Sequence, residues 1–347
     1  MEFEKNPYQQ FLSNALAKCI PVNLQIELTK KCNLKCQFCY NEDNTIFIKT
    51  DSVIKAIDEA TELGSFMLSL TGGEPLLHPD FYKIAEHSKR RGYFLIIQTN
   101  GVMINKNVAK KIAKLNPVGV DISLHGANEN THDFITGAKG SFKKTIKAIK
   151  NLRKLNCPVR IKVPVTKYNQ NELEQIKEIV NKFGCNIVFD PFISPKLNGD
   201  VKPLDFKPDF NNLKSYIEYT LTDNEGDIIG FEPRKLDGPL CGMGRTLLAI
   251  TAEGDVRACM RIPIELGNIY EESIIDTWKN SDKLKELRMI KRGDIISCRG
   301  CRLIEYCFIC LGLQLLKVNN LETPYKEACE NAILRKEFYE EKKIKKN

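Results

Sequence analysis

The segment Cys32-Asn33-Leu34-Lys35-Cys36-Gln37-Phe38-Cys39 places three cysteines within eight residues, separated by three and then by two others. A four-iron cluster held by thiolates needs four ligands, and this segment supplies three with no fourth cysteine nearby. One iron of such a cluster stays open to an outside ligand. The spacing suits a short loop that wraps around a cube-shaped four-iron cluster. The alternative is a zinc site, although zinc usually prefers paired CxxC arms and four protein ligands.

The runs around this segment alternate between strand-like and helix-like. Residues 22–28 (VNLQIEL) read as the strand that presents the cysteines, and similar runs occupy 66–71, 93–99, 118–124, 159–165 and 186–192. They are rich in Val, Ile, Leu and Phe, as buried parallel strands tend to be. Residues 141–155 and 171–183 carry apolar stripes of helical period. Six units, each a strand followed by a helix, predict an α/β fold, either a partial (β/α)6 barrel or a doubly wound open sheet.

In both folds, functional sites gather at the carboxyl ends of the strands. The polar and glycine-rich segments of this chain fall at those places. The cysteine segment follows the first strand, and the next three strands are followed by Thr71-Gly72-Gly73-Glu74-Pro75, Thr99-Asn100-Gly101 and Ser123-Leu124-His125-Gly126.

Bulk composition indicates an ordinary globular enzyme with room for two domains. The 347 residues are 42% hydrophobic and 28% charged, with a formal charge of +8. The lysines fall on predicted solvated helix faces and in the basic tail, and no aromatic-interleaved basic motif supports nucleic-acid binding. No apolar run approaches the roughly 18 residues of a membrane span, and no signal peptide is recognisable. The 13 cysteines of an expected cytoplasmic chain favour metal or redox chemistry over disulfides.

A second set of cysteines marks a change of composition. Residues 193–240 contain five prolines and read as a bridge with one helix near 209–222. Seven cysteines follow, at Cys241, Cys259, Cys298, Cys301, Cys307, Cys310 and Cys329. Seven thiolates exceed one four-ligand site and nearly fill two. Two zinc sites, or one zinc site with free thiols, are the alternative, because C-x2-C arms suit zinc.

The CxxxCxxC spacing with Phe38 before the last cysteine resembles the signature of radical S-adenosylmethionine (SAM) enzymes. Gly72-Gly73-Glu74-Pro75, one unit later, looks like the amine-binding motif of that family. The resemblance implies a SAM-binding [4Fe–4S] cluster on Cys32, Cys36 and Cys39, and it favours the partial (β/α)6 barrel.

The C-terminal pattern resembles the SPASM extension of these enzymes, which holds auxiliary [4Fe–4S] clusters. One cluster would take Cys241, Cys259 and Cys310, without a fourth cysteine. The other would take Cys298, Cys301, Cys307 and Cys329. One departure concerns Cys307 and Cys310, which are separated by two residues where the family usually has three.

The remaining SAM contacts follow from position. Gly72 and Gly73 leave space for close approach, and Glu74 offers a carboxylate to the SAM ammonium. Asn100 and Ser123 are expected to contact the ribose or the carboxylate, although turn and capping roles explain them equally well. Lys162 on the fifth strand is expected to make a polar contact, and Phe38 to pack beside the adenine. No catalytic acid or base is identified.

Domain boundaries are expected at residues 1–21 (lead-in), 22–192 (radical SAM barrel), 193–240 (bridge), 241–330 (SPASM-like) and 331–347 (basic helix or tail). The resemblance implies an oxidoreductase that cleaves SAM to a 5′-deoxyadenosyl radical and modifies a ribosomally made peptide or protein by crosslinking, oxidation or epimerisation. A separate leader-peptide-binding protein and an electron donor such as flavodoxin or ferredoxin are the expected partners. A radical SAM enzyme acting on a small metabolite, or a non-catalytic iron–sulfur electron-transfer protein, are the alternatives.

Overall fold

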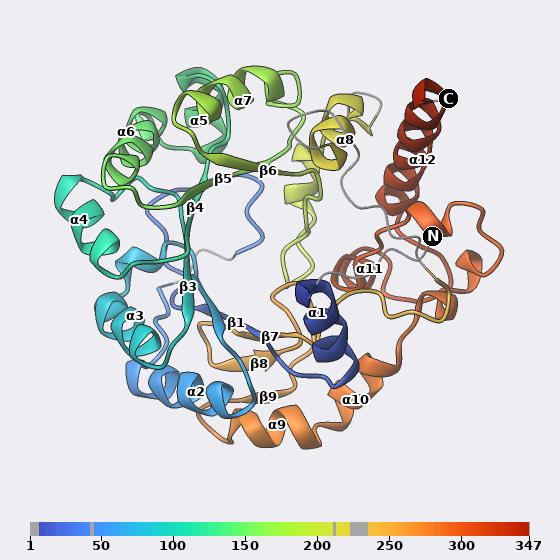
Figure 1. The fold of residues 1–347 in the computed structure, drawn as a ribbon, viewed down its shortest axis with the longest axis horizontal. Helices are drawn as coiled ribbons and strands as arrows, with labels where there is room; N and C mark the ends of the chain where they lie inside the picture. Colours follow the sequence, from blue (N-terminus) through green and yellow to red (C-terminus); the bar gives the residue numbers. More distant parts are fainter. Residues whose placement is uncertain (1–6, 42–44, 211–212, 223–234, 347) are drawn as a thin grey trace.

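Six parallel strands form the curved wall of a partial barrel (Figure 1). The computed structural model describes residues 7–41, 45–210, 213–222 and 235–346. The six strands are β1 (Asn23–Glu27), β2 (Met67–Thr71), β3 (Phe94–Thr99), β4 (Gly119–Ser123), β5 (Val159–Pro164) and β6 (Asn186–Asp190). Each pairs in parallel with its neighbour in the chain. A doubly wound sheet reverses its strand order at a switch point, so this sequential order confirms the barrel.

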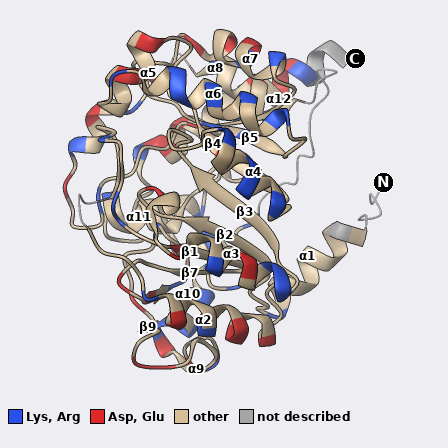
Figure 2. Cartoon of the chain, turned by 90° about the vertical axis from the view of Figure 1, so that its left-hand side faces the viewer, with Lys and Arg blue, Asp and Glu red and all other residues tan. Residues whose placement is uncertain are grey.

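Helices follow the strands and form the outer layer, as Figure 1 shows for α2 to α7. They are α2 (Thr50–Glu62), α3 (Phe81–Arg90), α4 (Lys106–Lys114), α5 (Glu129–Thr136), α6 (Ser141–Arg153) and α7 (Leu173–Lys182). Their apolar stripes face the sheet and their lysines face outward. The lysines of α6 are exposed, and Figure 2 shows basic residues along α4 and α6. The expected solvated basic faces are therefore present.

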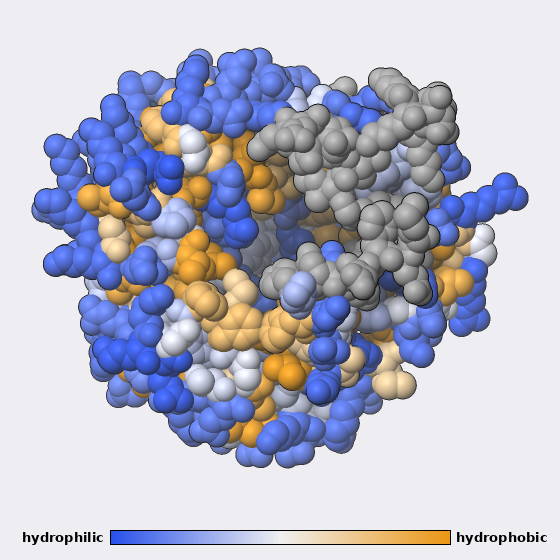
Figure 3. Space-filling model, viewed as in Figure 1, coloured by the Kyte–Doolittle hydropathy of each residue, from blue (hydrophilic) through white to orange (hydrophobic). Residues whose placement is uncertain are grey.

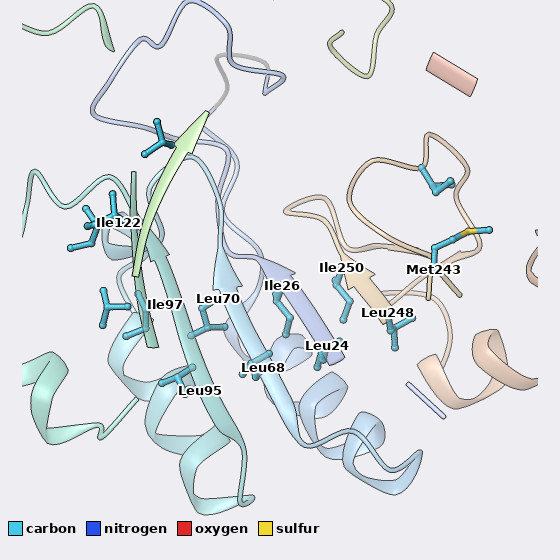
Figure 4. Close-up of a cluster of buried hydrophobic side chains, with 14 of the residues drawn as sticks. Leu24, Ile26, Leu68, Leu70, Leu95, Ile97, Ile122, Met243, Leu248 and Ile250 are labelled. Atoms are coloured by element: carbon cyan, nitrogen blue, oxygen red, sulfur yellow. The ribbon is translucent and has the colours of Figure 1, made fainter. Parts of the chain in front are cut away.

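The strands alternate between two different surroundings. Leu24, Leu68 and Leu95 lie side by side in neighbouring strands and are almost fully buried beneath the helices (Figure 4). The intervening residues, such as Gln25 and Ser69, point to the other face and are polar and only half-buried. Because successive side chains of a strand point to opposite faces, the apolar set packs under the helices and a polar set lines the inside of the barrel.

Three further strands extend the same sheet beyond β1. They are β7 (Leu247–Ile250), β8 (Asp255–Arg257) and β9 (Gly267–Asn268). β7 pairs in parallel with β1, whereas β8 and β9 add on antiparallel. The sequence analysis did not predict these strands, because they are only two to four residues long. The cysteine-rich C-terminal part therefore begins as a continuation of the barrel wall.

The remaining elements precede β1 or follow β6, except for one short 3-10 helix between β2 and α3. They are α1 (Pro7–Ala17), α8 (Lys214–Leu221), α9 (Ile274–Asn280), α10 (Asp282–Met289), α11 (Leu311–Lys317) and α12 (Lys326–Lys346), with the short 3-10 helices η1 (Pro75–Leu77), η2 (Lys202–Phe206), η4 (Arg292–Asp294), η5 (Ile296–Cys298) and η6 (Ile304–Tyr306). The helix predicted near 209–222 corresponds to α8, and residues 211–212 of that range lie outside the described residues. The basic tail is the end of α12.

Within the described part of the chain, no helix combines the length and apolar character needed to cross a bilayer. The surface seen in Figure 3 is hydrophilic round its rim, and apolar residues gather nearer its centre.

Candidate metal centre and cofactor cavity

The three cysteines of the first set lie in a loop that follows β1 and is fastened to α5. The backbone N–H groups of Lys35 and Gln37 donate to the carbonyl oxygens of Thr136 and Ile135, at 3.0 and 3.2 Å. The side-chain amide of Gln37 also donates to the carbonyl of Phe134, at 3.1 Å. These bonds fix a segment without regular secondary structure, so the loop presents Cys32, Cys36 and Cys39 in a defined arrangement.

The glycines after β2 allow two backbones to approach each other closely. A Cβ on Gly73 would lie 2.4 Å from the carbonyl oxygen of Lys31, and one on Gly72 would lie 2.6 Å from that of Thr29. The Gly73 N–H donates to the Thr29 carbonyl at 2.7 Å. The sequence analysis explained both glycines by the approach of SAM. In the structure, contact with the segment that leads into the cysteine loop is the stronger reason for glycine.

Glu74 is fully buried and holds together the turns that follow β2 and β3. Its carboxylate accepts hydrogen bonds from the Thr99 hydroxyl at 2.8 and 2.9 Å, and from the backbone N–H groups of Asn100 and Leu76 at 2.9 and 3.2 Å. Burial raises the pKa of this carboxyl group to about 7. Glu74 does not line the cavity described below. In the structure its carboxylate therefore bonds to groups of the chain itself and does not reach a ligand in the cavity.

A cavity of about 480 Å³ opens where the cysteine loop meets the carboxyl ends of the strands. All the residues that the sequence analysis assigned to the SAM site line it, apart from Glu74: Cys32, Cys36, Phe38, Cys39, Gly72, Gly73, Asn100, Ser123 and Lys162. These residues come from five β/α units, and the fold brings them to one place. The shared cavity is the main geometric feature of the candidate site.

Of the charged side chains on β4 and β5, Asp121 and Lys162 line this cavity, and the sequence analysis missed Asp121 and its partner Arg160. Asp121 is almost fully buried, receives two hydrogen bonds from Arg160 at 2.6 and 2.9 Å, and pairs with Lys162 at 3.1 Å. Two cations therefore share one carboxylate, which leaves a net positive charge beside the cavity. Asp121 precedes Ser123 by two residues, as Arg160 precedes Lys162, so strand alternation would have found both.

Aromatic and imidazole rings close one side of the cavity. The Phe38 ring lies 5.4 Å from the His125 ring, measured between centroids, and the His132 ring lies 5.4 Å further on. The backbone N–H of His125 donates to Nδ1 of His132 at 3.1 Å. Burial lowers the pKa of His125 to about 3 and that of His132 to about 4. Both rings are therefore neutral at physiological pH.

The C-terminal cysteines form two groups in space. Cys259 lies within electrostatic range of Cys241 and Cys310. The second group is formed by Cys298, Cys301, Cys307 and Cys329, each of which lies near others of the group. The two groups contain the same cysteines as the ligand sets that the resemblance implied, and Cys310 lies near Cys259 despite its shortened spacing.

Tyr40 lies between the cavity and the first of these groups. It lines the cavity, and its phenol is within electrostatic range of Cys39, Arg261 and Cys259. Arg261 pairs with Asp190, at the end of β6, at 2.8 Å. This junction places the Cys241, Cys259 and Cys310 group on the Tyr40 side of the cavity.

The sulfur donors of the cysteine loop, Cys32, Cys36 and Cys39, suit an iron–sulfur cluster. Three soft sulfur donors line the cavity, and Asp121 is the only carboxylate among the described residues that line it. Burial raises the pKa of the Cys32 thiol to about 11, so a metal must displace its proton on binding. Among the described residues, no group of three His, Cys, Asp or Glu side chains is arranged to hold a single metal ion.

Comparisons with known proteins agree with this geometry. Residues 26–183 match the family model described as the radical SAM superfamily. Residues 241–302 match the model described as an iron–sulfur cluster-binding domain, SPASM. The two matches cover the barrel with its cysteine loop and the beginning of the cysteine-rich C-terminal part.

Two curated relatives align along most of their length. The AdoMet-dependent heme synthase of Methanosarcina barkeri is 28% identical over 315 residues, which is 82% of this chain and 89% of that protein. The mycofactocin maturase MftC of Mycolicibacterium smegmatis is 28% identical over 305 residues, covering 83% and 77%. Among solved structures, SuiB of Streptococcus suis bound to its precursor peptide SuiA superposes with a TM-score of 0.65 at 19% identity, covering 95% of this chain and 83% of SuiB. That likeness shows a shared fold.

Proposed function

Because the chain belongs to the radical SAM superfamily and carries a SPASM domain, we propose that it is a maturase that modifies a ribosomally made peptide. Membership of this superfamily makes it an enzyme that uses SAM and a [4Fe–4S] cluster. MftC is a maturase by name, and SuiB has been solved with a precursor peptide. Both support a peptide as the substrate here.

One observation carries the proposal: the cysteine loop, the glycine turn after β2 and the ends of β3, β4 and β5 share a single cavity. Cys32, Cys36 and Cys39 would hold three irons of the cluster and leave the fourth open to the amino and carboxylate groups of SAM. A non-catalytic electron-transfer protein has no use for such a cavity beside its cluster, which makes that alternative the weakest.

The chain's own residues would bind and orient SAM. The peptide groups of Gly72 and Gly73 line the cavity and would receive the ammonium, while Lys162 supplies the cation for the carboxylate. Ser123 lies opposite Lys162 in the β4–β5 register and would contact the ribose. Phe38 and the neutral ring of His125 would pack beside the adenine. When bound, the reduced cluster supplies the electron that splits SAM into methionine and a 5′-deoxyadenosyl radical.

The C-terminal cysteines would hold one or two auxiliary clusters. We assign Cys241, Cys259 and Cys310 to one, and Cys298, Cys301, Cys307 and Cys329 to the other. The first group lies toward Tyr40 and the cavity, which suits net oxidation of a substrate such as crosslink formation. Its fourth ligand would come from another residue, water or the substrate.

Other partners are part of the same proposal. A separate protein would recognise the leader of the precursor peptide, and flavodoxin or ferredoxin would deliver electrons. The cytoplasm is the proposed location, because 13 cysteines without a disulfide among those described suit a reducing compartment.

The test is anaerobic reconstitution followed by iron and sulfide counting. The protein is then incubated with SAM, a reductant and a candidate precursor peptide, and both products are followed by mass spectrometry. The expected result is 5′-deoxyadenosine together with a mass change in the peptide. Cleavage of SAM with no change in any peptide, but turnover of a free small molecule, would replace the proposal.

A second candidate function is the modification of a small metabolite such as a tetrapyrrole. The heme synthase relative favours it, because that protein aligns over 89% of its length. Incubation with a free porphyrin in place of the peptide distinguishes the two candidates.

A further inference from the structure

The side chain of Asn100 has an orientation that the surrounding hydrogen bonds determine. The backbone N–H of Val102 donates to Oδ1 of Asn100 at 2.9 Å. Because a backbone N–H only donates, that atom is the amide oxygen, and the amide nitrogen must point the other way. It points at the cysteine loop, where Nδ2 lies 2.8 Å from Oδ1 of Asn33 and 3.8 Å from Sγ of Cys32.

The backbone of Asn100 is held on both sides. Its N–H donates to the buried Glu74 carboxylate at 2.9 Å, and its carbonyl accepts from the Thr145 hydroxyl at 3.1 Å. The amide therefore projects from a fixed support and does not depend on a ligand for its position. A second N–H, from the backbone of Leu34, lies 3.5 Å from the same sulfur.

An N–H dipole that points at a ligating thiolate stabilises the more negative form of a cluster. Hydrogen bonds to the sulfurs are among the factors that set iron–sulfur reduction potentials, and groups around the ligands tune a metal centre. We propose that Asn100 raises the reduction potential of the cluster by donating a hydrogen bond to Sγ of Cys32. The proposal rests on the proposed function, because it requires the cluster at Cys32, Cys36 and Cys39.

This role differs from the SAM contact that the sequence analysis expected for Asn100. A side chain that only binds SAM affects SAM affinity and leaves the potential of the SAM-free cluster unchanged. A donor to Cys32 changes that potential before SAM is added. The potential without SAM therefore separates the two roles.

The experiment is an anaerobic redox titration of the reconstituted full-length protein without SAM, followed by low-temperature EPR. The signal of the cluster is the one that Cys36→Ala lacks. Asn100→Asp keeps the shape and the Oδ1 acceptor but removes the donor, and Asn100→Ala removes the whole amide. Asn151→Ala is the matched control, because that amide donates at 3.3 Å to Ile104, away from the cavity.

Both Asn100 variants are expected to be harder to reduce, Asn100→Asp more so because it brings a negative charge to the sulfur. A tenfold loss in the reduction equilibrium corresponds to about 59 mV for one electron. Asn151→Ala should match the wild-type protein. An unchanged potential in Asn100→Asp, with SAM affinity alone reduced, would overturn the proposal.

Two further measurements keep the test decisive. If Asn100→Asp does not load iron, Asn100→Ala takes its place in the redox titration, because it removes the amide without adding a charge. Asn33→Ala removes the other partner of the amide and should not lower the potential, whereas a fall equal to that of Asn100→Ala would mean general loosening of the loop and contradict the proposal. A wild-type protein that lacks any Cys36-dependent signal would instead refute the proposed function itself.

Discussion

The buried carboxylate of Glu74 accepts a 2.9 Å hydrogen bond from the backbone N–H of Asn100. This bond joins the turn after β2 to the turn after β3, and both turns touch the cysteine loop. Gly73 packs on the backbone of Lys31, and the Asn100 amide reaches Cys32. The main role of the glycine-rich turn is therefore to support the cysteine loop.

Glu74 should make stability depend on pH. Burial raises the pKa of the carboxyl group from 4.5 to about 7 in the folded protein. Between those values the folded state binds more protons than the unfolded state, so the free energy of unfolding falls as pH rises from 4.5 to 7, by about 2–3 kcal/mol. Glu74→Gln lacks this titration.

Thermal unfolding at several pH values between 5.5 and 8 checks this prediction. Contributions from other titrating groups cancel when the wild-type and Glu74→Gln proteins are compared at each pH. The wild-type protein should lose stability relative to the variant as pH rises. A difference that stays constant over the range would show that Glu74 does not have the raised pKa.

Replacing Gly73 should disturb the cysteine loop. In Gly73→Ala the new Cβ meets the carbonyl oxygens of Lys31 and Lys30 at 2.4 and 2.5 Å, so the backbone must move. A loss of about 1–3 kcal/mol in stability and a lower iron content are expected. Gly119→Ala is the control, because its Cβ meets nothing closer than 3.9 Å. Equal iron loading in both variants would remove the support role from Gly73.

Removing one thiol of the first centre should abolish SAM cleavage. In Cys36→Ala two thiolates remain, which do not hold a four-iron cluster in working geometry. Cys157→Ala is matched to it, because Cys157 is a buried thiol of the hydrophobic core and does not line the cavity. Its loss should reduce stability by only about 1 kcal/mol and leave 5′-deoxyadenosine formation intact. Full cleavage activity in Cys36→Ala would refute the assignment.

The two C-terminal cysteine groups should lose iron independently. Cys301→Ala is expected to lower the iron content by about four atoms per chain, and Cys310→Ala to remove a separate set, so that the double variant shows both losses. Cys301→Ala should still cleave SAM but form no modified product. If either single variant emptied both groups, the cysteines would form one joint centre. Iron analysis and circular dichroism of each variant distinguish that result from unfolding.

Much of this arrangement could be predicted from the sequence, because local patterns carry it. The strand runs predicted β1 to β6 in order, and the cysteine spacing predicted the loop after β1. The position of polar segments after each strand predicted which residues would line one cavity. In a parallel barrel these segments meet, whatever their separation in the chain.

The remaining features depend on contacts between distant residues. Nothing local to Glu74 shows that Thr99 and Asn100 will occupy its carboxylate, so the sequence analysis directed it at SAM. The run at residues 247–250 is too short to mark a strand until β1 offers a pairing edge. Strand alternation places Asp121 on the face of Ser123, but the ion pairs with Arg160 and Lys162 that make its burial tolerable join separate strands.

Low-temperature EPR of the reduced, reconstituted protein before and after addition of SAM is the most direct test of a cluster with one open iron on Cys32, Cys36 and Cys39. SAM should change the signal that is missing from Cys36→Ala and leave the other signals as they were. A spectrum that SAM leaves unchanged, in a protein with its full iron content, would contradict that site.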